Sequence, residues 1–489
     1  MNKNIILIGR FFVFTIGCFI ALCFTSCKKM VEVDPPNYLA SNNVYDNDVT
    51  AIAVLNGMYQ YLSAGVPGSE NYILGITKFA AISADELSLA DNNNALLNAY
   101  FRNSLEAKET FNPGSGLWTM VFPDIFNCNR NIDLLSASDN LTPSVKQQLL
   151  GELKFMRAFY YYYLVNLYGD IPIITSDYQV NRLLPRKPIL EVYNYILEDL
   201  KDAKTLLSAN FIDGALNPYP PGSEERTRPN KWAASAMLAR VYLYLQDWAN
   251  AEAESSSIIQ NTSLFNLVGL NDVFLKNSDE AIWQLQPVET NINTKIGIEL
   301  SLVHGIASGE RNTYLSTDMM SSFETGDQRM ISWVGTYISP SQIYPYPNKY
   351  KIADAIPDIT EYQMVLRLAE QYLIRAEARI RQNNIAQGIE DLNAIRTRAR
   401  GTDQGDLPDI SSSLTPEDAL DAVDHERRVE LFTEWGDRWL HLKRRGKIDE
   451  VMSVITPQKG GSWESYQQWY PIPYNDVLMN VNLKQTQGY

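Results

Sequence analysis

The sequence predicts a mainly α-helical fold built from stacked helical pairs, with one inserted region of loops and short strands. Residues 231–260 show small and large side chains at the spacing of a tetratricopeptide unit, whose small residues let paired helices approach closely. The positions are Leu238, Ala239, Tyr242 and Ala251. Residues 368–399 repeat this pattern more loosely. Residues 262–360 break it, with prolines, many Gly and Ser, and short alternating apolar pieces. We therefore expect an α-α superhelix that carries an insertion.

Four more helices are expected before the first of these pairs, and two of them precede residue 140. Residues 46–64 place apolar side chains on one helix face, and residues 117–135 are helical in pattern. The expected face of the first helix consists of Val49, Ile52, Ala53, Leu55, Asn56 and Tyr59. The stretch 65–117 is rich in Gly, Asn and Ser and is expected to be irregular.

A long helix is expected to start at Pro143, because proline directly after Thr142 is typical of a first helical turn. It should run to Tyr168, where a glycine follows. Another helix is expected over about 188–208, and the proline-rich residues 209–229 should form a loop. These helices, with the two repeat-like pairs, account for the predicted fold class.

Residues 1–26 have the features of a secretory signal peptide. A positively charged start and an apolar run precede Thr25, Ser26 and then Cys27. The run of about 14 residues is too short for a membrane-spanning helix, which needs roughly 20. We expect cleavage before Cys27, lipidation of Cys27 by chains such as palmitate, and a single mature domain at 27–489. A plain signal peptide with an incidental cysteine is the alternative.

Charge and cysteine content limit the possible partners and cross-links. The formal net charge of −15 repels phosphate backbones, so nucleic acid is not an expected partner. Beyond Cys27 the sequence has only Cys128, so no internal disulfide is expected and stability must come from packing. Because no second apolar run is long enough to span a bilayer, the acyl chain is the expected membrane attachment.

Four pairs of short segments occur between residue 157 and the last residue. They are RAF (157–159) with LYGDIP (167–172), LRLAEQYLIRAEA (366–378) with DLNAIR (391–396), ERRVEL (426–431) with EWGDRW (434–439), and YPIP (470–473) with QTQGY (485–489). Their content and order resemble the SusD/RagB family of Bacteroidetes outer-membrane nutrient-binding lipoproteins. Each pair is weak alone, and the four together are highly specific.

This resemblance implies a scaffold of four tetratricopeptide-like pairs with a variable, loop-rich region, which here corresponds to about 262–360. It implies a lipid-anchored protein on the exterior of the outer membrane. Such a protein captures a nutrient, usually an oligosaccharide, and delivers it to a SusC-like TonB-dependent transporter. We expect no cofactor, no catalytic metal ion and no covalent chemistry, and a structural calcium ion held by acidic residues is the alternative left open.

The charged residues of the third segment pair stand three or four positions apart. They are Glu426, Arg427, Glu430, Glu434 and Arg438. We expect them on one helix, where such spacings form ion pairs along a face, and within a helical array they should bridge neighbouring helices. Arg375 and Glu377 lie in an apolar helix and should be paired if they are buried. We interpret both groups as structural.

A glycan-binding surface is better supported by aromatic residues in the irregular stretches. A pyranose ring stacks its C–H face on a flat ring, while its hydroxyls seek amide, carboxylate and guanidinium groups. Each ring contributes only about 1 kcal/mol, so several must act together to reach micromolar affinity at about −8 kcal/mol. The candidates are Tyr72, Tyr100, Tyr314, Trp333, Tyr337, Tyr344 and Tyr346, with Asn92, Asn93 and Arg311 as polar partners. Ordinary loop packing is the alternative for each ring.

Enzymatic and metal chemistry have little support in the sequence. His425-Glu426 lacks the second histidine of a zinc-protease helix. Glycoside hydrolysis needs two carboxylates at a fixed separation, and no pair stands out among 57 acidic residues. We therefore expect a non-enzymatic oligosaccharide-binding protein. A peptide or glycopeptide binder of the same build is the second hypothesis, and a glycoside hydrolase is the third.

Overall fold

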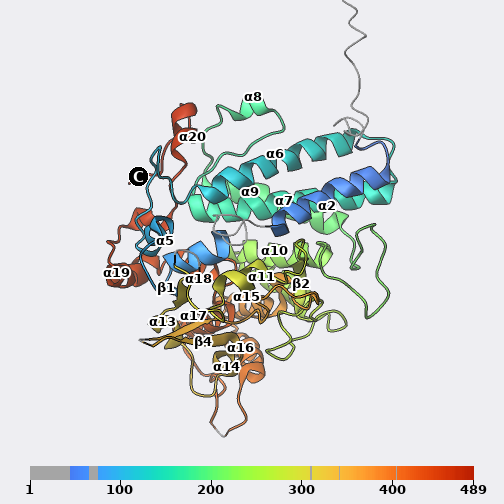
Figure 1. Cartoon of the computed structure of the whole chain (residues 1–489). Coiled ribbons are helices and arrows are strands. Elements are labelled where there is room, and N and C mark those ends of the chain that lie inside the picture. Colours follow the sequence, from blue (N-terminus) through green and yellow to red (C-terminus); the bar gives the residue numbers. More distant parts are fainter. Residues whose placement is uncertain (1–43, 65–74, 309–310, 341, 404) are drawn as a thin grey trace, which may run out of the picture. The chain divides into compact units, whose positions relative to one another are not determined.

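Helices lie side by side through most of the structure (Figure 1). This computed structural model describes residues 44–64, 75–308, 311–340, 342–403 and 405–489, and Tyr45–Tyr489 form one compact unit. The predicted signal peptide, the predicted lipidation site Cys27 and the candidate Tyr72 lie outside the described residues.

The helical stack confirms the predicted fold class. Its elements are α2 (Asp48–Ala64), η1 (Gly75–Phe79), α4 (Ala80–Ser83), α5 (Ala95–Phe101), α6 (Gly116–Ala137), α7 (Pro143–Tyr168), α8 (Tyr178–Asn181), α9 (Ile189–Leu206), α10 (Lys231–Tyr244), α11 (Trp248–Ile259), α12 (Lys295–Leu300), α13 (Thr317–Met320), α14 (Gln328–Trp333), α15 (Leu368–Arg381), α16 (Ile385–Ala399), α17 (Pro416–Leu431), α18 (Asp437–Arg444), α19 (Ile448–Gln458), η2 (Ser465–Gln468) and α20 (Tyr474–Met479). Packing runs continuously from α6 through α7, α9, α10 and α11 to α15, and from there to α16 and α17.

Short strands form two-stranded antiparallel sheets, most of them in the predicted insertion. In the described residues these are β1 (Leu87–Leu89) with β3 (Thr313–Leu315), β2 (Ala281–Leu285) with β6 (Gln363–Arg367), and β4 (Val334–Ile338) with β5 (Ile343–Pro347). The short helices α12, α13 and α14 also belong to this region and were not predicted. Each has a Thr, Ser or Asp N-cap residue, whose side chain accepts a hydrogen bond from a backbone N–H of the first turn.

Helix α7 lies at the centre of the stack. It starts at Pro143, as predicted, and ends where Gly169 takes a φ of +76°. The consecutive residues Tyr160, Tyr161, Tyr162 and Tyr163 are all buried, although they point in different directions around the helix. Burial on every side follows from the contacts of α7 with α2, α6, α9 and α10.

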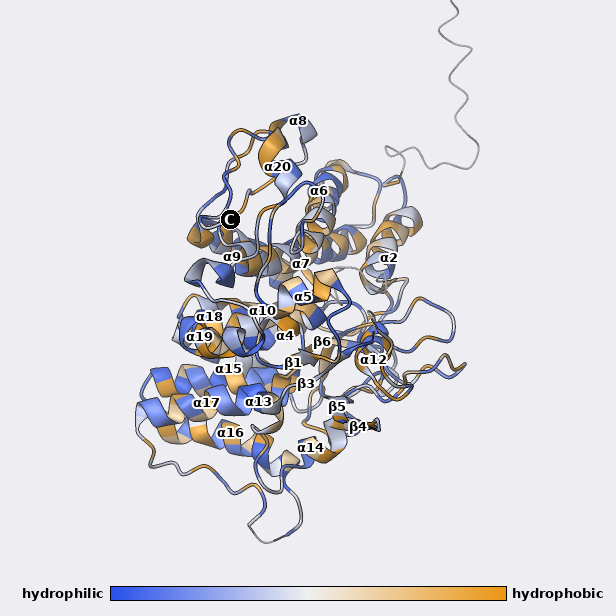
Figure 2. Cartoon of the chain, turned by 60° about the vertical axis from the view of Figure 1, so that its left-hand side comes forward, coloured by the Kyte–Doolittle hydropathy of each residue, from blue (hydrophilic) through white to orange (hydrophobic). Residues whose placement is uncertain are grey.

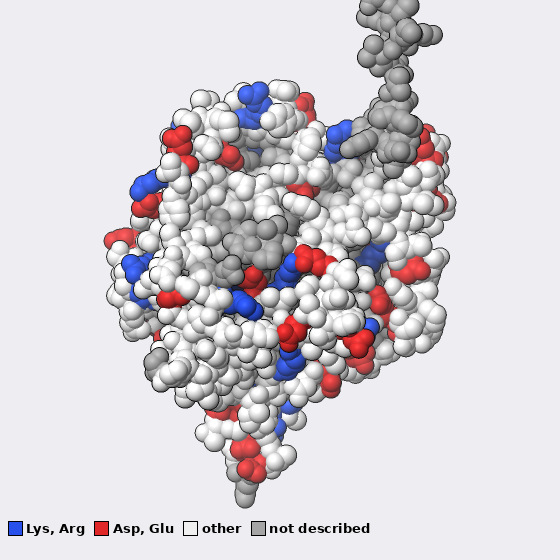
Figure 3. All heavy atoms as spheres, in the orientation of Figure 1, with Lys and Arg blue, Asp and Glu red and all other residues white. Residues whose placement is uncertain are grey.

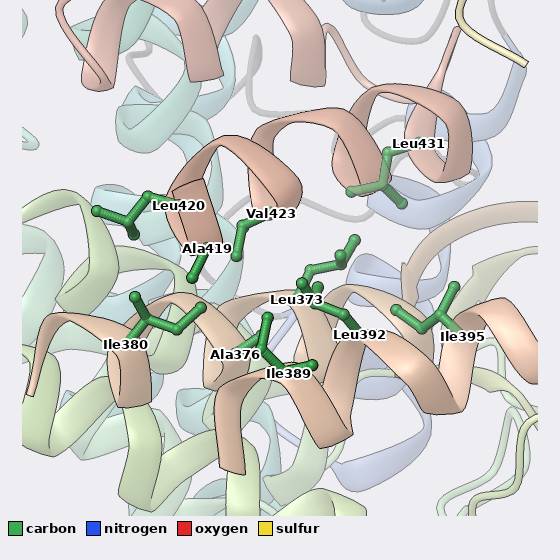
Figure 4. Close-up of a cluster of buried hydrophobic side chains, with 10 residues drawn as sticks. All are labelled: Leu373, Ala376, Ile380, Ile389, Leu392, Ile395, Ala419, Leu420, Val423 and Leu431. Atoms are coloured by element: carbon green, nitrogen blue, oxygen red, sulfur yellow. The ribbon is translucent and has the colours of Figure 1, made fainter. Parts of the chain in front are cut away.

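An apolar cluster joins α15, α16 and α17 (Figure 4). Its buried residues are Leu373, Ala376, Ile380, Ile389, Leu392, Ile395, Ala419, Leu420, Val423 and Leu431. The close approach of α15 and α16 depends on Gly388. A Cβ atom added there would lie 2.8 Å from the carbonyl oxygen of Ala376 and 2.6 Å from Cγ1 of Ile380.

We expect Gly388→Ala to lower the free energy of unfolding by about 1–3 kcal/mol, because the new methyl group forces the two helices apart. The matched control is Gly57→Ala in α2, where an added Cβ would meet no atom within 4 Å. That variant should gain up to about 1 kcal/mol from helix propensity. Urea unfolding followed by circular dichroism measures both, and equal effects at the two positions would contradict the close-approach argument.

Three local predictions were wrong. Val49 of α2 is 76% exposed, and the buried residues of that helix are Ala51, Leu55, Leu62 and Ser63. The stretch 65–117, predicted to be irregular, contains η1, α4, β1 and α5. Finally, the charged residues of the third segment pair do not share one helix. Helix α17 ends at Leu431, and α18 begins at Asp437 after positive φ angles at Thr433, Trp435 and Gly436.

Candidate functional site

Four tyrosines come together where the β1–β3 sheet meets the β4–β5 hairpin. Tyr314 lies on β3, Tyr337 on β4, and Tyr344 and Tyr346 on β5. All four pack in one cluster around the buried side chain of Leu302. Strand β3 pairs with β1 and also contacts β5, so the two sheets are neighbours (Figure 2). We call these four residues the tyrosine surface.

The register of the hairpin gives it an aromatic inner face. Tyr337 lies opposite Tyr344, and Gly335 lies opposite Tyr346. Because alternate residues of a strand share a face, all three tyrosines point to the same side. The rings of Tyr337 and Tyr344 stack with centroids 6.2 Å apart and planes 26° apart. Gly335 leaves room for the ring of Tyr346, which any Cβ at that position would overlap.

The four tyrosines differ in exposure and therefore in what they offer a ligand. Tyr344 and Tyr346 are 9% and 7% exposed and support the others from beneath. Tyr314 and Tyr337 are half-buried. The ring of Tyr314 stands edge-on to Tyr344, with centroids 5.1 Å apart and planes at 83°. Tyr314 and Tyr337 are therefore the more accessible residues of the tyrosine surface.

The loops before β3 and after β1 supply polar groups beside the tyrosines. The Asn93 side-chain amide donates a 2.8 Å hydrogen bond to Ser308 Oγ, and the Asn93 backbone N–H donates to an Asp91 carboxylate oxygen at 2.9 Å. Asn92 is exposed, and Arg311 is half-buried. The two loops thus hold amide, carboxylate and guanidinium groups at the edge of the tyrosine surface. We call Asp91, Asn92, Asn93, Ser308 and Arg311 the polar rim.

Sequence reasoning missed two residues that shape this region. Ser308 connects the two loops through its bond to Asn93. Gly305, with a φ of +84°, lets its loop lie against Tyr337, whose hydroxyl oxygen would be 3.1 Å from an added Cβ. Neither residue carries a chemical signal of its own. The period-two pattern of Tyr344 and Tyr346 was the available indication of a strand here.

Two candidates from the sequence are core residues. Tyr100 lies in α5, is 2% exposed, and packs against Phe79 and Tyr470 with ring centroids 4.5 and 5.4 Å away. Trp333 ends α14, is fully buried, and donates its indole N–H to the Leu270 carbonyl at 2.8 Å. Their expected place in irregular loops was wrong, and neither presents a face to a ligand.

The charged residues of the third segment pair form a buried network. The Glu430 carboxylate accepts hydrogen bonds from Arg329 at 2.9 Å and Arg367 at 2.6 Å, and also from Arg398. Arg329 also binds Glu426 at 2.5 Å. These contacts join α14, β6, α16 and α17, so the predicted bridging between elements is confirmed.

The other predicted buried pairs are present as well. Arg375 binds Asp391 at 2.7 Å, and Glu377 binds Arg444 at 2.6 Å. Burial alone would raise the pKa of Glu430, but the positive charges of Arg398, Arg367 and Arg329 outweigh burial and hold it well below the usual range. Glu430 is therefore ionised at neutral pH, and its ion pairs hold the four elements together.

The described residues offer little for metal or membrane-spanning roles. Within the described ranges, no group of three or more His, Cys, Asp or Glu lies close enough to hold a metal ion. The thiol of Cys128 is buried in α6, where burial raises its pKa. Searched over the same part of the chain, the helices include none with the length and apolarity that a bilayer crossing requires.

A separate apolar hollow of about 690 Å³ lies between α6, α8 and α20. Its lining includes Trp118, Phe122, Phe126, Tyr178 and Met479. The indole N–H of Trp118 is bonded to Asp476 at 2.7 Å, so two of its polar groups satisfy each other. This hollow suits apolar groups better than sugar hydroxyls.

Comparisons with known proteins agree with this structure. A family described as "Starch-binding associating with outer membrane" matches residues 49–243, and the SusD family matches residues 341–489. A SusD-like protein of Formosa agariphila is 23% identical, with 95% of this chain and 96% of the relative covered. The starch-binding protein SusD of Bacteroides thetaiotaomicron is also 23% identical, with 73% and 75% covered.

Solved structures show the same fold. A SusD superfamily protein from Bacteroides vulgatus aligns with a TM-score of 0.75 at 20% identity, covering 90% of this chain and 99% of that one. A structure described as a laminarin-binding SusD-like protein aligns with a TM-score of 0.72 at 20% identity, covering 91% and 100%.

The helical-repeat scaffold and the two family matches define the class of this protein as SusD-like. The two family matches together cover more than two thirds of the chain. The chain belongs to the SusD/RagB family, a family of carbohydrate-binding, outer-membrane-associated proteins. Residues 244–340, between the two matches, hold most of the insertion, including Tyr314 and Tyr337.

Proposed function

We propose that this protein captures a glycan on the tyrosine surface and delivers it to a partner TonB-dependent transporter of the SusC type. In this proposal residues 1–26 are removed, Cys27 carries the lipid, and the mature chain 27–489 faces the cell exterior. Tethering at the membrane holds the captured ligand close to the transporter and so raises its effective concentration there. The family membership supports the delivery step.

One observation carries the choice of site. Of the ten residues selected from sequence, four tyrosines form one cluster and three polar residues lie in the loops that flank β1 and β3, so that seven residues from three separate stretches of the chain belong to this region. They are Asn92, Asn93, Arg311, Tyr314, Tyr337, Tyr344 and Tyr346. The combination of flat rings and polar side chains suits a sugar, which has apolar faces and a hydroxyl edge. The laminarin-binding structural neighbour also supports a glycan ligand.

The proposed site predicts moderate affinity that depends on both exposed rings. We expect Tyr337→Ala and Tyr314→Ala each to weaken glycan binding about 5- to 30-fold, which corresponds to about 1–2 kcal/mol of lost stacking. Isothermal titration of residues 28–489 with neutral oligosaccharides measures this. Chromatography of the ligand afterwards should recover it intact, because no bond is broken.

Two matched variants make this test specific. Tyr337→Phe keeps the ring and should retain most of the affinity. Tyr178→Ala removes a tyrosine that is 64% exposed in α8 and should leave glycan affinity unchanged. Wild-type affinity in both alanine variants of the tyrosine surface would refute this site.

A second candidate function, peptide capture, is favoured by the apolar hollow between α6, α8 and α20. A volume of about 690 Å³ with aromatic walls accommodates one or two bulky side chains. A peptide panel distinguishes the two functions. Peptide binding that is lost in Phe126→Ala and kept in Tyr337→Ala would place the ligand in the hollow instead of on the tyrosine surface.

A further inference from the structure

The hairpin that carries most of the tyrosine surface has no charged side chain. Residues 330–348 contain no Asp, Glu, Lys or Arg. Arg329 and Lys349 flank this stretch, and both are buried with their charges directed inward. Arg329 binds Glu426 and Glu430, and the Lys349 ammonium binds Glu434 at 2.5 Å. The flanking cations are thus already paired inside the protein and are not offered to a ligand.

The surroundings of the hairpin include an exposed cation at its base, Lys351, whose ammonium donates to the carbonyl oxygens of Ser332 and, at 2.6 Å, of Asn348. In the described part of the polar rim, Arg311 is the cation and Asp91 is the anion. Asp354, on a neighbouring exposed loop, is bonded to His304 at 2.7 Å. Figure 3 shows the result: the lower left of this face, where Figure 1 places β4, is largely white. The whole chain carries a net charge of −15.

An acidic sugar would meet an unfavourable environment on this surface. Its carboxylate would lose hydration against tyrosine rings, while the Lys351 ammonium is already bonded to backbone carbonyls at the base of the hairpin. It would also experience the field of a negatively charged protein. A neutral sugar incurs neither cost, because its hydroxyls can pair with Asn92, Asn93 and water while its C–H face meets the rings.

We infer that the tyrosine surface selects uncharged glycans and rejects those that carry uronate or sulfate groups. This inference rests on the proposed function and names the ligand class of that same site. The selectivity is a property of residues 330–348 and the polar rim, so a single cation placed at the rim should relax it.

The test compares oligosaccharides of equal length by isothermal titration. The neutral probes are derived from laminarin and starch, and the acidic probes from polygalacturonate and alginate. Wild-type protein should bind a neutral probe and should bind the acidic probes at least about 5- to 10-fold more weakly. Asn92→Lys should strengthen binding of the acidic probes by about 5- to 10-fold, and added salt should reverse that gain.

Asn140→Lys is the matched control, because Asn140 is also exposed but lies in the turn between α6 and α7. It adds the same charge and should leave acidic binding unchanged. Equal or tighter wild-type binding of the acidic probes would overturn the selectivity while glycan capture stands. An equal gain in Asn140→Lys would overturn the assignment to this surface. Failure to bind any probe would refute the proposed function, and the selectivity with it.

Discussion

Glu430→Ala is expected to lower the free energy of unfolding by about 3–5 kcal/mol, because it removes the shared partner of three buried arginines. Arg329 and Arg367 are fully or almost fully buried, and Arg398 is buried with them. Without the Glu430 carboxylate, their positive charges repel one another in a region that water does not reach. Urea unfolding monitored by tryptophan fluorescence measures the loss.

The controls separate buried charge from simple truncation. Glu390→Ala removes an exposed glutamate from α16 and should change the free energy of unfolding by less than about 0.5 kcal/mol. Glu430→Gln keeps the shape and removes the charge, so it should be nearly as destabilising as alanine. The folded fraction of Glu430→Ala should retain glycan affinity. A stable Glu430→Ala protein that no longer binds glycan would show instead that the network belongs to the binding site.

The same carboxylate predicts a pH dependence. Its pKa in the folded protein is depressed below its ordinary value of 4.5, because the three arginines outweigh the effect of burial. The stability that it contributes is therefore fully present above pH 4.5 and is lost as the pH falls toward the folded-state pKa. Glu430→Gln should flatten the acid limb of the stability profile, whereas an unchanged limb would assign acid sensitivity to other carboxylates.

Trp333→Ala is also expected to cost about 3–5 kcal/mol of stability, because it empties a large buried site. The ring packs 5.7 Å from Phe274, and the Lys349 ammonium lies 4.8 Å from its centroid. Its indole N–H bond to Leu270 is lost as well. Thermal unfolding measures the effect, and Trp333→Phe should be milder because part of the volume remains filled.

Glycan binding distinguishes this core role from the ligand contact that the sequence suggested for Trp333. Measured on the folded fraction, affinity in Trp333→Phe should equal that of the wild type. Tyr337→Ala should show the reverse pattern, with weakened binding and a small change in stability. If Trp333→Phe lost affinity at unchanged stability, the core assignment would be wrong.

The sequence was most informative where structure is decided locally. The start of α7 at Pro143 and its end before Gly169 follow from the backbone preferences of proline and glycine, which do not depend on tertiary contacts. The pairs α10–α11 and α15–α16 follow from small residues at helical spacing. Helix α4 was missed because it has only four residues, all of them buried, and no local sequence pattern predicts so short a buried helix. The break after α17 was missed because Thr433 and Trp435 adopt positive φ angles that are unusual for such residues.

The site was predictable by residue type and only partly by place. Tyr344 and Tyr346 alternate as strand residues do, which agrees with the short strands predicted for this region, but the hairpin itself was not predicted. Tyr100 and Trp333 belong to the same residue types and stand in similarly irregular sequence, yet both are buried. The solvent exposure of each ring depends on which distant segments pack over it. Such tertiary contacts cannot be predicted from a single sequence by residue type or spacing.

The anchoring of the hairpin has a consequence for how such proteins diversify. Strand β4 begins directly after Trp333, and β5 ends two residues before Lys349, whose ammonium binds the Glu430 carbonyl at 2.8 Å. Trp333 and Lys349 therefore fix the two ends of residues 334–347. In the described structure this segment makes no ion pair with the helical scaffold. Under the proposed function, we expect a relative's hairpin transplanted between Trp333 and Lys349 to bring its own ligand preference without remodelling the helices.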